Sequence, residues 1–293
     1  MSLFKGSGAA LVTPFNAGGV NLDALGKLID FVIDGGTDAL FVLGTTGEPS
    51  TMTRAEKERV LEFSIARAAK RAPVFAGSGA NDTLAAVEQS KRFADMGADG
   101  LLVVTPYYNK CTQNGCVAHY AAVSDAVKIP IVAYNVPTRT GFNIAPATAA
   151  RLADIKNVRA LKEAGGDIDQ IIEVAKLLHD KMDWYSGDDS LTVPCMSLGA
   201  KGVISVAANV IPKQVRDMTA LCLSGDYPGA AELQFKILAF VKTLFKEVNP
   251  IPCKKALQFI GIDAGVPRLP LTEMEKANAD ILFGEMKKIG LVR

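Results

Sequence analysis

The sequence predicts an α/β fold, a (β/α)8 TIM barrel followed by a C-terminal helical appendage. Eight short apolar segments alternate with helical segments at roughly equal spacing, and eight βα units are the number that closes such a barrel. The apolar segments are continuous, as in 39–44 (ALFVLG), which is typical of parallel strands buried on both faces. An open doubly wound sheet is the alternative, but no G-x-G-x-x-G motif follows the first strand.

Strands are expected where a short apolar run ends in glycine, proline or a polar turn. The first run, GAALVTPF, shows this pattern because it is apolar up to Pro14. The expected strands are 8–15, 39–44, 73–79, 100–106, 130–137, 158–164, 184–188 and 201–207.

Helix boundaries follow from capping residues between these strands. Asn21 can cap a helix that two glycines stop after position 34. Thr53 and Glu56 have the spacing of a capping box, which predicts a helix to about residue 70. Pro146 lies in the first turn of another helix. Further helices are expected from 82 or 83 to 97, through His119 to 127, over 168–178 and over 191–198.

After about residue 224 the alternation stops and only helices are expected. Residues 227–248 form a long amphipathic pattern and 252–260 a shorter one. Thr272 and Glu275 have capping-box spacing and predict a last helix that ends near residue 289. The expected division is a barrel that carries the active site and a helical region, at 1–224 and 225–293.

Composition indicates an ordinary globular protein and argues against several classes. Of 293 residues, 22% are charged, the net charge is +1, and no run of Lys or Arg suggests nucleic-acid binding. No apolar run approaches the ~20 residues that span a bilayer, and the N-terminus lacks the pattern of a signal peptide. The five cysteines are odd in number and scattered, which argues against a disulfide framework. We expect a cytoplasmic protein with no membrane or nucleic-acid partner.

No metal and no cofactor are expected. Cys111, Cys116 and His119 lie close together in sequence, but their spacing matches no zinc site and a fourth ligand is missing. Three carboxylates near the ends of the expected strands could hold a divalent cation. Such residues more often cap the following helix or pair with a lysine. They are Glu163, Asp188 and Asp189.

Lys162 lies near the C-terminal end of strand 158–164, where barrels of this kind carry their active sites. A lysine kept neutral by burial is a nucleophile toward a carbonyl carbon, whereas the structural alternative is a salt bridge with Glu163 or a neighbour. Burial is the first candidate for lowering its pKa, and Arg139 is the second. The other strand ends carry hydroxyls and one arginine but no histidine: Thr45, Thr46, Tyr107, Tyr108, Tyr134, Arg139 and Ser205.

A lysine among hydroxyls, without a metal, indicates Schiff-base chemistry on a keto acid. In such chemistry tyrosines relay protons and an arginine holds a carboxylate. Three motifs then give a resemblance: 44–48 (GTTGE), 134–141 (YNVPTRTG) and 162–164 (KEA) resemble the dihydrodipicolinate synthase family. That family belongs to the pyruvate-dependent class I aldolases, together with N-acetylneuraminate lyase. The likeness covers essentially the whole chain and includes 105–109, 186–189, 202–206 and 249–252.

The resemblance implies a lyase that condenses pyruvate with L-aspartate-4-semialdehyde to 4-hydroxy-tetrahydrodipicolinate, on the diaminopimelate route to lysine. Lys162 would form the imine with pyruvate. Thr45, Tyr134 and Tyr108 would form a hydroxyl relay, with Tyr108 reaching in from a partner subunit. A homotetramer built from two tight dimers is implied as well.

The resemblance also implies how the substrates are held. Backbone amides of the turn at Thr45 and Thr46 would bind the pyruvate carboxylate, and Arg139 would bind the carboxylate of the semialdehyde. The carbonyls of Gly187 and Ile204 would line the pocket near the lysine. Arg139 favours the synthase over the alternative, an N-acetylneuraminate lyase or keto-sugar-acid aldolase, because sialic-acid lyases lack an arginine in that loop.

Relatives that lysine inhibits bind it at the tight-dimer interface, and here the sequence departs from them. Ala85 lies where inhibited members offer a carboxylate to the lysine amine, and Arg54 and Lys57 add positive charge. An ammonium group there would lack its partner, so weak or absent feedback is expected. The matching positions are Pro49, Ser50, Arg54, Lys57, Asn81, Ala85 and Tyr107.

Overall fold

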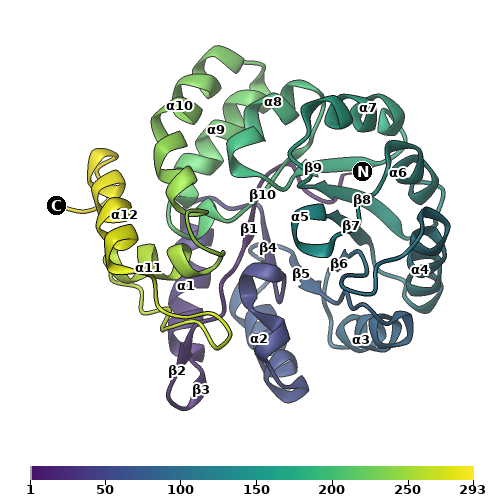
Figure 1. Cartoon of the computed structure of the whole chain (residues 1–293), viewed down its shortest axis with the longest axis horizontal. Helices are drawn as coiled ribbons and strands as arrows, with labels where there is room; N and C mark the ends of the chain where they lie inside the picture. The colour runs from purple at the N-terminus through teal and green to yellow at the C-terminus, as the bar shows by residue number, and fades with distance from the viewer. Residues whose placement is uncertain (1) are drawn as a thin grey trace.

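The computed structural model describes residues 2–293 and confirms the predicted (β/α)8 barrel with added C-terminal helices. Eight parallel strands close on themselves in the order β1-β10-β9-β8-β7-β6-β5-β4, and the helices surround them (Figure 1). The strands are β1 Gly6–Ala10, β4 Ala39–Val42, β5 Val74–Gly77, β6 Gly100–Val104, β7 Ile131–Asn135, β8 Val158–Glu163, β9 Asp183–Ser186 and β10 Gly202–Ser205.

The helices of the barrel begin where the capping residues predict. Asn21 accepts from the amide of Ala24, and Thr53 and Glu56 form a complete capping box. The helices are α1 Leu22–Asp34, α2 Arg54–Ala68, α3 Thr83–Asp95, α4 Gln113–Ala126, α5 Pro137–Thr140, α6 Pro146–Leu152, α7 Ile168–Leu178, α8 Thr192–Ser197 and α9 Pro212–Ser224.

The first strand is shorter than the predicted 8–15 because a side chain replaces part of the ladder. β1 ends at Ala10, whose carbonyl accepts from the Asn209 side chain at 2.8 Å. The amide of Val12 donates to the same Asn209 side chain at 3.1 Å. Beyond it lies a small hairpin that the sequence pattern does not predict, β2 Phe15–Asn16 and β3 Gly19–Val20.

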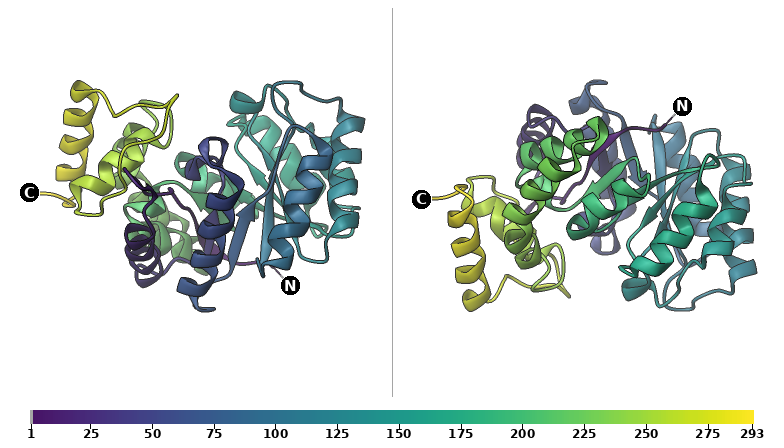
Figure 2. Two further views of the ribbon diagram at one scale, coloured as in Figure 1. Left: turned by 90° about the horizontal axis from the view of Figure 1, so that it is seen from below. Right: turned by 90° about the horizontal axis from the view of Figure 1, so that it is seen from above.

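The C-terminal helices are α10 Tyr227–Thr243, α11 Ile251–Phe259 and α12 Lys276–Lys288. Helices α11 and α12 lie together to one side of the barrel, and α12 packs against α10 (Figures 1 and 2). The predicted helix 227–248 is too long, since α10 ends at Thr243. This leaves residues 244–250 to run back toward the strand ends.

The predicted capping box at Thr272 and Glu275 is wrong, because α12 begins only at Lys276 and has no side-chain cap of its own. The carboxylate of Glu247, from the loop after α10, takes that role instead. It accepts from the amide of Glu275 at 3.1 Å and from the side-chain amide of Asn278 at 2.7 Å. The helix start is therefore fixed by a distant segment.

Aromatic residues fill the barrel at its N-terminal end. Phe4, which precedes β1, stacks on Tyr185 with 4.2 Å between ring centroids, and Phe41 stacks on Phe75 at 4.8 Å. The hydroxyl of Tyr185 donates to the carbonyl of Phe4 at 2.9 Å. This end is a packed core, so a ligand would have to enter at the C-terminal ends of the strands.

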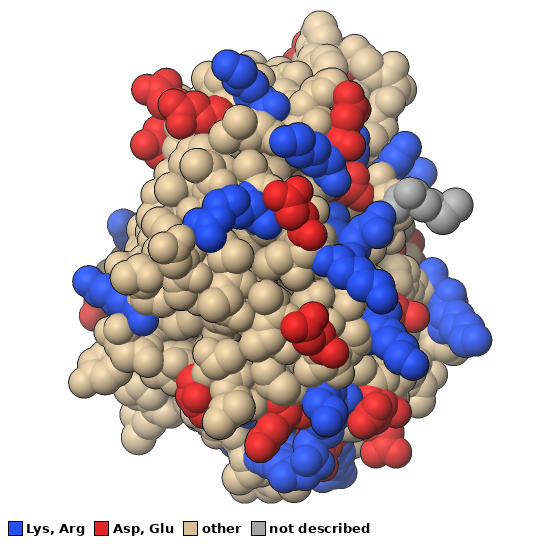
Figure 3. Space-filling view, turned by 90° about the vertical axis from the view of Figure 1, so that its right-hand side faces the viewer, with Lys and Arg blue, Asp and Glu red and all other residues tan. Residues whose placement is uncertain are grey.

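None of the helices described is long and apolar enough to cross a membrane. The face in Figure 3 carries Lys and Arg as well as Asp and Glu, beside a broad area that has neither.

Candidate active site

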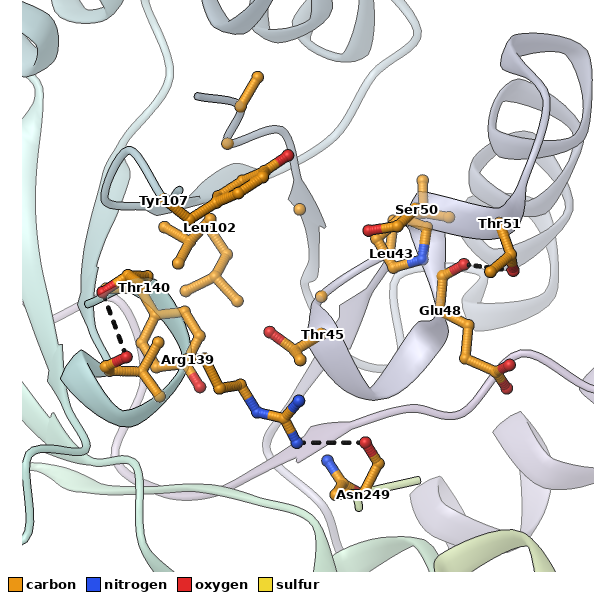
Figure 4. Close-up of a pocket in the computed structure, with 18 of the residues that line it drawn as sticks. Leu43, Thr45, Glu48, Ser50, Thr51, Leu102, Tyr107, Arg139, Thr140 and Asn249 are labelled. Atoms are coloured by element: carbon orange, nitrogen blue, oxygen red, sulfur yellow. Dashed lines mark hydrogen bonds between the residues drawn. The ribbon is translucent and has the colours of Figure 1, made fainter. Parts of the chain in front are cut away.

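A cavity of about 380 Å³ opens at the C-terminal ends of the strands. It lies between the turn after β4, the loop after β6, the segment after β7 and the loop after α10. Figure 4 shows Arg139 extending toward Thr45 and Asn249, with Tyr107 on the opposite wall and Leu102 between them. Polar side chains from all four segments reach this cavity, among them Thr45, Tyr107, Tyr134, Arg139 and Asn249.

Lys162 is 4% exposed and lies beside the cavity rather than in its lining. Register places it next to Tyr134 of β7 and Tyr185 of β9, because strands β7, β8 and β9 are parallel and adjacent. Its Nζ atom is 4.4 Å from the centroid of the Tyr134 ring, which does line the cavity. The amine therefore lies against the ring of a tyrosine that lines the cavity.

The pKa of Lys162 is lowered to about 8, and burial is the main cause. The negative charge of Asp189 opposes this shift, while the positive charge of Arg139 adds to it. Both causes named from the sequence, burial first and Arg139 second, thus act in the expected direction. A lysine with this pKa exposes a usable fraction of neutral amine near neutral pH.

Tyr134 is buried, and its hydroxyl is influenced by two neighbours, Thr45 and Arg139. Burial raises its pKa to about 12, whereas the charge of Arg139 and the side chain of Thr45 lower it. The backbone below it is fixed, because the hydroxyl of Tyr120 accepts from the Tyr134 amide at 3.3 Å and donates to the carbonyl of Val103 at 2.7 Å. The phenol stays protonated and can give and receive a proton in turn.

The turn that follows β4 is the 3₁₀ segment Thr45–Gly47. The carbonyl of Gly47 accepts from the hydroxyl of Thr13 at 2.7 Å, which anchors the turn to the loop after β1. Thr46 is buried, and its hydroxyl accepts from the side-chain amide of Asn249 at 2.9 Å. Thr45 is the member of the turn that faces the cavity (Figure 4).

Arg139 lies in the short helix α5 and reaches across the mouth of the cavity. Its Nη2 donates to the backbone carbonyl of Asn249 at 3.1 Å (Figure 4). Asn249 therefore joins Arg139 and Thr46, from a loop outside the barrel. Sequence reasoning assigns no role to Asn249, because no pattern in the sequence around 249–252 shows that this loop returns to the strand ends.

Gly187 lies against the lysine as expected. A methyl group at this position would be 2.7 Å from Cβ of Ala164 and 3.0 Å from Cε of Lys162, so only glycine leaves room for the side chain. Ile204 is fully buried in β10 and does not line the cavity. The structure thus brings together Lys162, Tyr134 and Gly187, with Thr45 and Arg139 above them.

Tyr108 is a predicted site residue that its own chain does not bring to the cavity. Its side chain is 90% exposed, and its backbone is in the left-handed region with φ of 69°. This conformation is unusual for a tyrosine. Tyr107, one residue earlier, does line the cavity.

The three carboxylates near the strand ends each bind protein donors. Glu163 accepts from the side chain of Asn135 at 3.0 and 3.1 Å and from the amide of Gly165 at 2.6 Å. Asp188 caps the following turn through the amide of Ser190 at 2.8 Å. The third, Asp189, binds the segment after β10. The capping alternative is correct for Asp188, and Glu163 forms no salt bridge with Lys162.

Most of the positions matched to a lysine site line either the cavity or a smaller cleft of about 160 Å³. Lys57 borders both, and burial lowers its pKa. Arg54 and Ala85 border only the cleft, and Arg54 pairs with Glu58 at 2.9 Å. Part of the charge attributed to Arg54 is therefore neutralised. The cavity side holds Pro49, Ser50 and Tyr107, and Asn81 contacts Asn109 through its carbonyl.

Known proteins match this chain along its length. The model of the dihydrodipicolinate synthetase family matches residues 3–288. The 4-hydroxy-tetrahydrodipicolinate synthase of Caldicellulosiruptor bescii is 52% identical over 292 residues and 99% of each chain is covered. That of Clostridium tetani is 49% identical over 294 residues, with 100% of both chains covered. The crystal structure of dihydrodipicolinate synthase from Aquifex aeolicus has a TM-score of 0.96 at 47% identity, covering 98% of this chain and 99% of that chain.

Proposed function

Because the chain belongs to the dihydrodipicolinate synthetase family, we propose that Lys162 carries its reaction by forming a Schiff base with pyruvate. The activity is that of a 4-hydroxy-tetrahydrodipicolinate synthase, a lyase, and the relatives favour it over N-acetylneuraminate lyase. It condenses pyruvate with L-aspartate-4-semialdehyde. The observation that carries the proposal for Lys162 is its buried amine with a pKa of about 8 beside Tyr134.

The reaction begins when the neutral amine attacks the keto carbon of pyruvate, and water leaves to give the imine. The protonated imine is an electron sink, so a methyl proton is lost and an enamine forms. The enamine attacks the aldehyde carbon of the second substrate. The amino group of that substrate then displaces Lys162, which closes a six-membered ring and restores the free lysine. The product is 4-hydroxy-tetrahydrodipicolinate.

Protons must leave the attacking amine and reach the departing water and the aldehyde oxygen. Tyr134 is the proposed shuttle because it is protonated, buried and next to both Lys162 and Thr45. Thr45 would pass the proton on to Tyr108 of a partner subunit. The high exposure of Tyr108 in a single chain supports this role.

Two carboxylates must be held during the condensation. Backbone amides of the turn at Thr45 and Thr46 would hold that of pyruvate, and Arg139 that of the semialdehyde. The position of Arg139 across the cavity mouth, braced by Asn249, supports its role. The carbonyls of Gly187 and Ile204 would complete the wall beside the amine.

The test of Lys162 is reductive trapping. The protein is incubated with pyruvate and borohydride, digested, and its peptides are weighed. We expect an adduct on the peptide that carries Lys162 and none with Lys162→Ala. An adduct on another peptide would reject the assignment. With Arg139→Leu, use of the semialdehyde should fall far more than pyruvate trapping.

We also propose weak or absent feedback by lysine. Lys57 adds a positive charge to the cleft, and Ala85 has no carboxylate that could bind the amine of the effector. Inhibition by lysine below about 1 mM would contradict this proposal. Lysine titration of the purified enzyme at fixed substrate is the measurement.

The proposed assembly is a homotetramer of two tight dimers. Exposed apolar side chains in two places support it, since stable interfaces bury such groups. One place is formed by α3 and the loop after β6, with Leu84 and Tyr108, and the other is on α7, with Ile168 and Ile172. Location in the cytoplasm remains an expectation from the sequence.

A further inference from the structure

A buried ion pair lies just outside the proposed chemistry. Nζ of Lys254, in the first turns of α11, is 2.6 Å from Oε1 of Glu48, which follows the turn at Thr45. The two side chains are 1% and 2% exposed. In Figure 4 the Glu48 side chain points away from Thr45 and Arg139. None of the proposed catalytic steps uses either charge.

Backbone hydrogen bonds tie Glu48 to the turn that contains Thr45. Its amide donates to the carbonyl of Thr45 at 3.2 Å, and its carbonyl accepts from the amide of Thr51 at 3.1 Å. Its backbone is left-handed, with φ of 55°, a conformation that costs free energy for a residue with a side chain. Contacts of the side chain help to offset this cost.

Those contacts come from the C-terminal region. Besides Lys254, the carboxylate of Glu48 accepts from the backbone amide of Arg268 at 3.0 Å. Nζ of Lys254 lies 4.2 Å from the centroid of the Phe15 ring, and the guanidinium of Arg268 lies at the same distance from that ring. The ammonium of Lys254 and the carboxylate of Glu48 are opposite charges in direct contact, so they attract each other strongly in this buried setting.

The residue two positions before α11 holds the same turn from its other side. The side chain of Asn249 donates to the hydroxyl of Thr46, two residues before Glu48. Asn249 and Lys254, just before and within α11, thus contact the turn at Thr46 and at Glu48, on either side of Gly47. A shift of α11 would move the amides that face the cavity.

Stability does not explain why charges occupy these positions. A buried ion pair is often no more stabilising than apolar residues of similar size, although loss of one partner is strongly destabilising. We propose that Glu48 and Lys254 are positioning residues, which hold the Thr45–Thr46 turn in the geometry that binds the carboxylate of pyruvate. This inference rests on the role proposed above for that turn.

The experiment compares Glu48→Gln, Lys254→Met and the double variant. Lys255→Met is the matched control, because Lys255 is on the same helix and pairs with the exposed Glu273 at 2.9 Å. For each protein the melting temperature, kcat and the KM values for both substrates are measured. Borohydride trapping with pyruvate identifies the lysine that reacts.

Each single variant should melt at a lower temperature, because one buried charge is left alone. Its KM for pyruvate should rise about tenfold to a hundredfold, the effect of small misplacement near a reacting group. The double variant should regain most of its thermal stability but keep the raised KM for pyruvate. The KM for the semialdehyde should change much less, and Lys255→Met should match the unmodified protein.

A double variant that regains both the melting temperature and the native KM for pyruvate would overturn the inference, since the pair would then contribute only to stability. The same holds for single variants with native KM. Trapping separates these results from a failure of the proposed function: if the unmodified protein gives no adduct at Lys162, the Schiff-base proposal itself fails. The double variant keeps the test decisive if the single variants do not fold.

Discussion

The pKa of Lys162 is set mainly by burial and is adjusted by two opposite charges, those of Arg139 and Asp189. Burial lowers its pKa most, Arg139 lowers it further, and Asp189 raises it. Asp189 is also needed where it is, because it accepts from the hydroxyl of Ser205 and from the amide of Val206 at 2.9 Å. A carboxylate that builds the barrel rim therefore limits how far the pKa of the lysine can fall.

This balance predicts the pH dependence of imine formation. A neutral amine is required, and the neutral fraction falls about tenfold for each pH unit below the pKa. The rate of pyruvate trapping should rise with pH and level off above about 8, the pKa of Lys162. Arg139→Leu should move the midpoint to higher pH because a positive charge that lowers the pKa is lost.

Trapping uses pyruvate alone, so the role proposed for Arg139 toward the second substrate does not enter the measurement. Arg151→Leu is the control, since Arg151 is exposed and bonds to Asn114. A midpoint that stays in place or moves to lower pH in Arg139→Leu would refute the electrostatic argument.

At the scale of elements, most of the fold could be predicted because the signals are local. Continuous apolar runs define the eight strands, and Asn21 and Thr53 cap helices as their sequence context indicates. The predictions failed where a distant side chain replaces a local one. Asn209 ends β1 early, and Glu247 caps α12 in place of the box at 272–275. No local pattern contains that information.

The cap supplied by Glu247 predicts a change in stability. Glu247→Ala removes the acceptor for the amide of Glu275 and for Asn278, and should lower the free energy of unfolding by about 1 kcal/mol. Glu247→Gln keeps an acceptor and should lose less. Thermal or urea denaturation measures both.

Glu273→Ala is the control, because this carboxylate lies within the segment 272–275 predicted as a capping box but is exposed beside Lys255. It should leave the denaturation midpoint unchanged. If Glu273→Ala destabilises the protein more than Glu247→Ala does, the assignment of the cap is incorrect.

At the scale of the whole molecule, the candidate site has two parts of different predictability. Thr45, Tyr134 and Lys162 meet because the C-terminal ends of parallel strands share one rim, whatever their separation in sequence. Asn249 and Lys254 lie after the barrel, and no periodic pattern relates them to that rim. Only the folded path of the loop after α10 shows that the helical region contacts the candidate site.

The role proposed for Tyr108 would extend this dependence beyond one chain. Tyr108 has a left-handed backbone conformation, is 90% exposed and does not pack in the core of its own chain. It directly follows Tyr107, which lines the cavity. If it acts in a partner's site, each active site needs Lys162 from one chain and Tyr108 from the other. Two variants that are each inactive could then restore one another.

Lys162→Ala and Tyr108→Phe should each lose nearly all activity as separate proteins. Co-expressed in equal amounts, they should form mixed dimers at about half of the total, each with one complete site of two. The mixture should regain about a quarter of the activity of the unmodified protein. Borohydride should trap pyruvate only on the Tyr108→Phe chain, which keeps Lys162. If Tyr108 acted within its own chain, every site of the mixture would lack one residue and no activity would return.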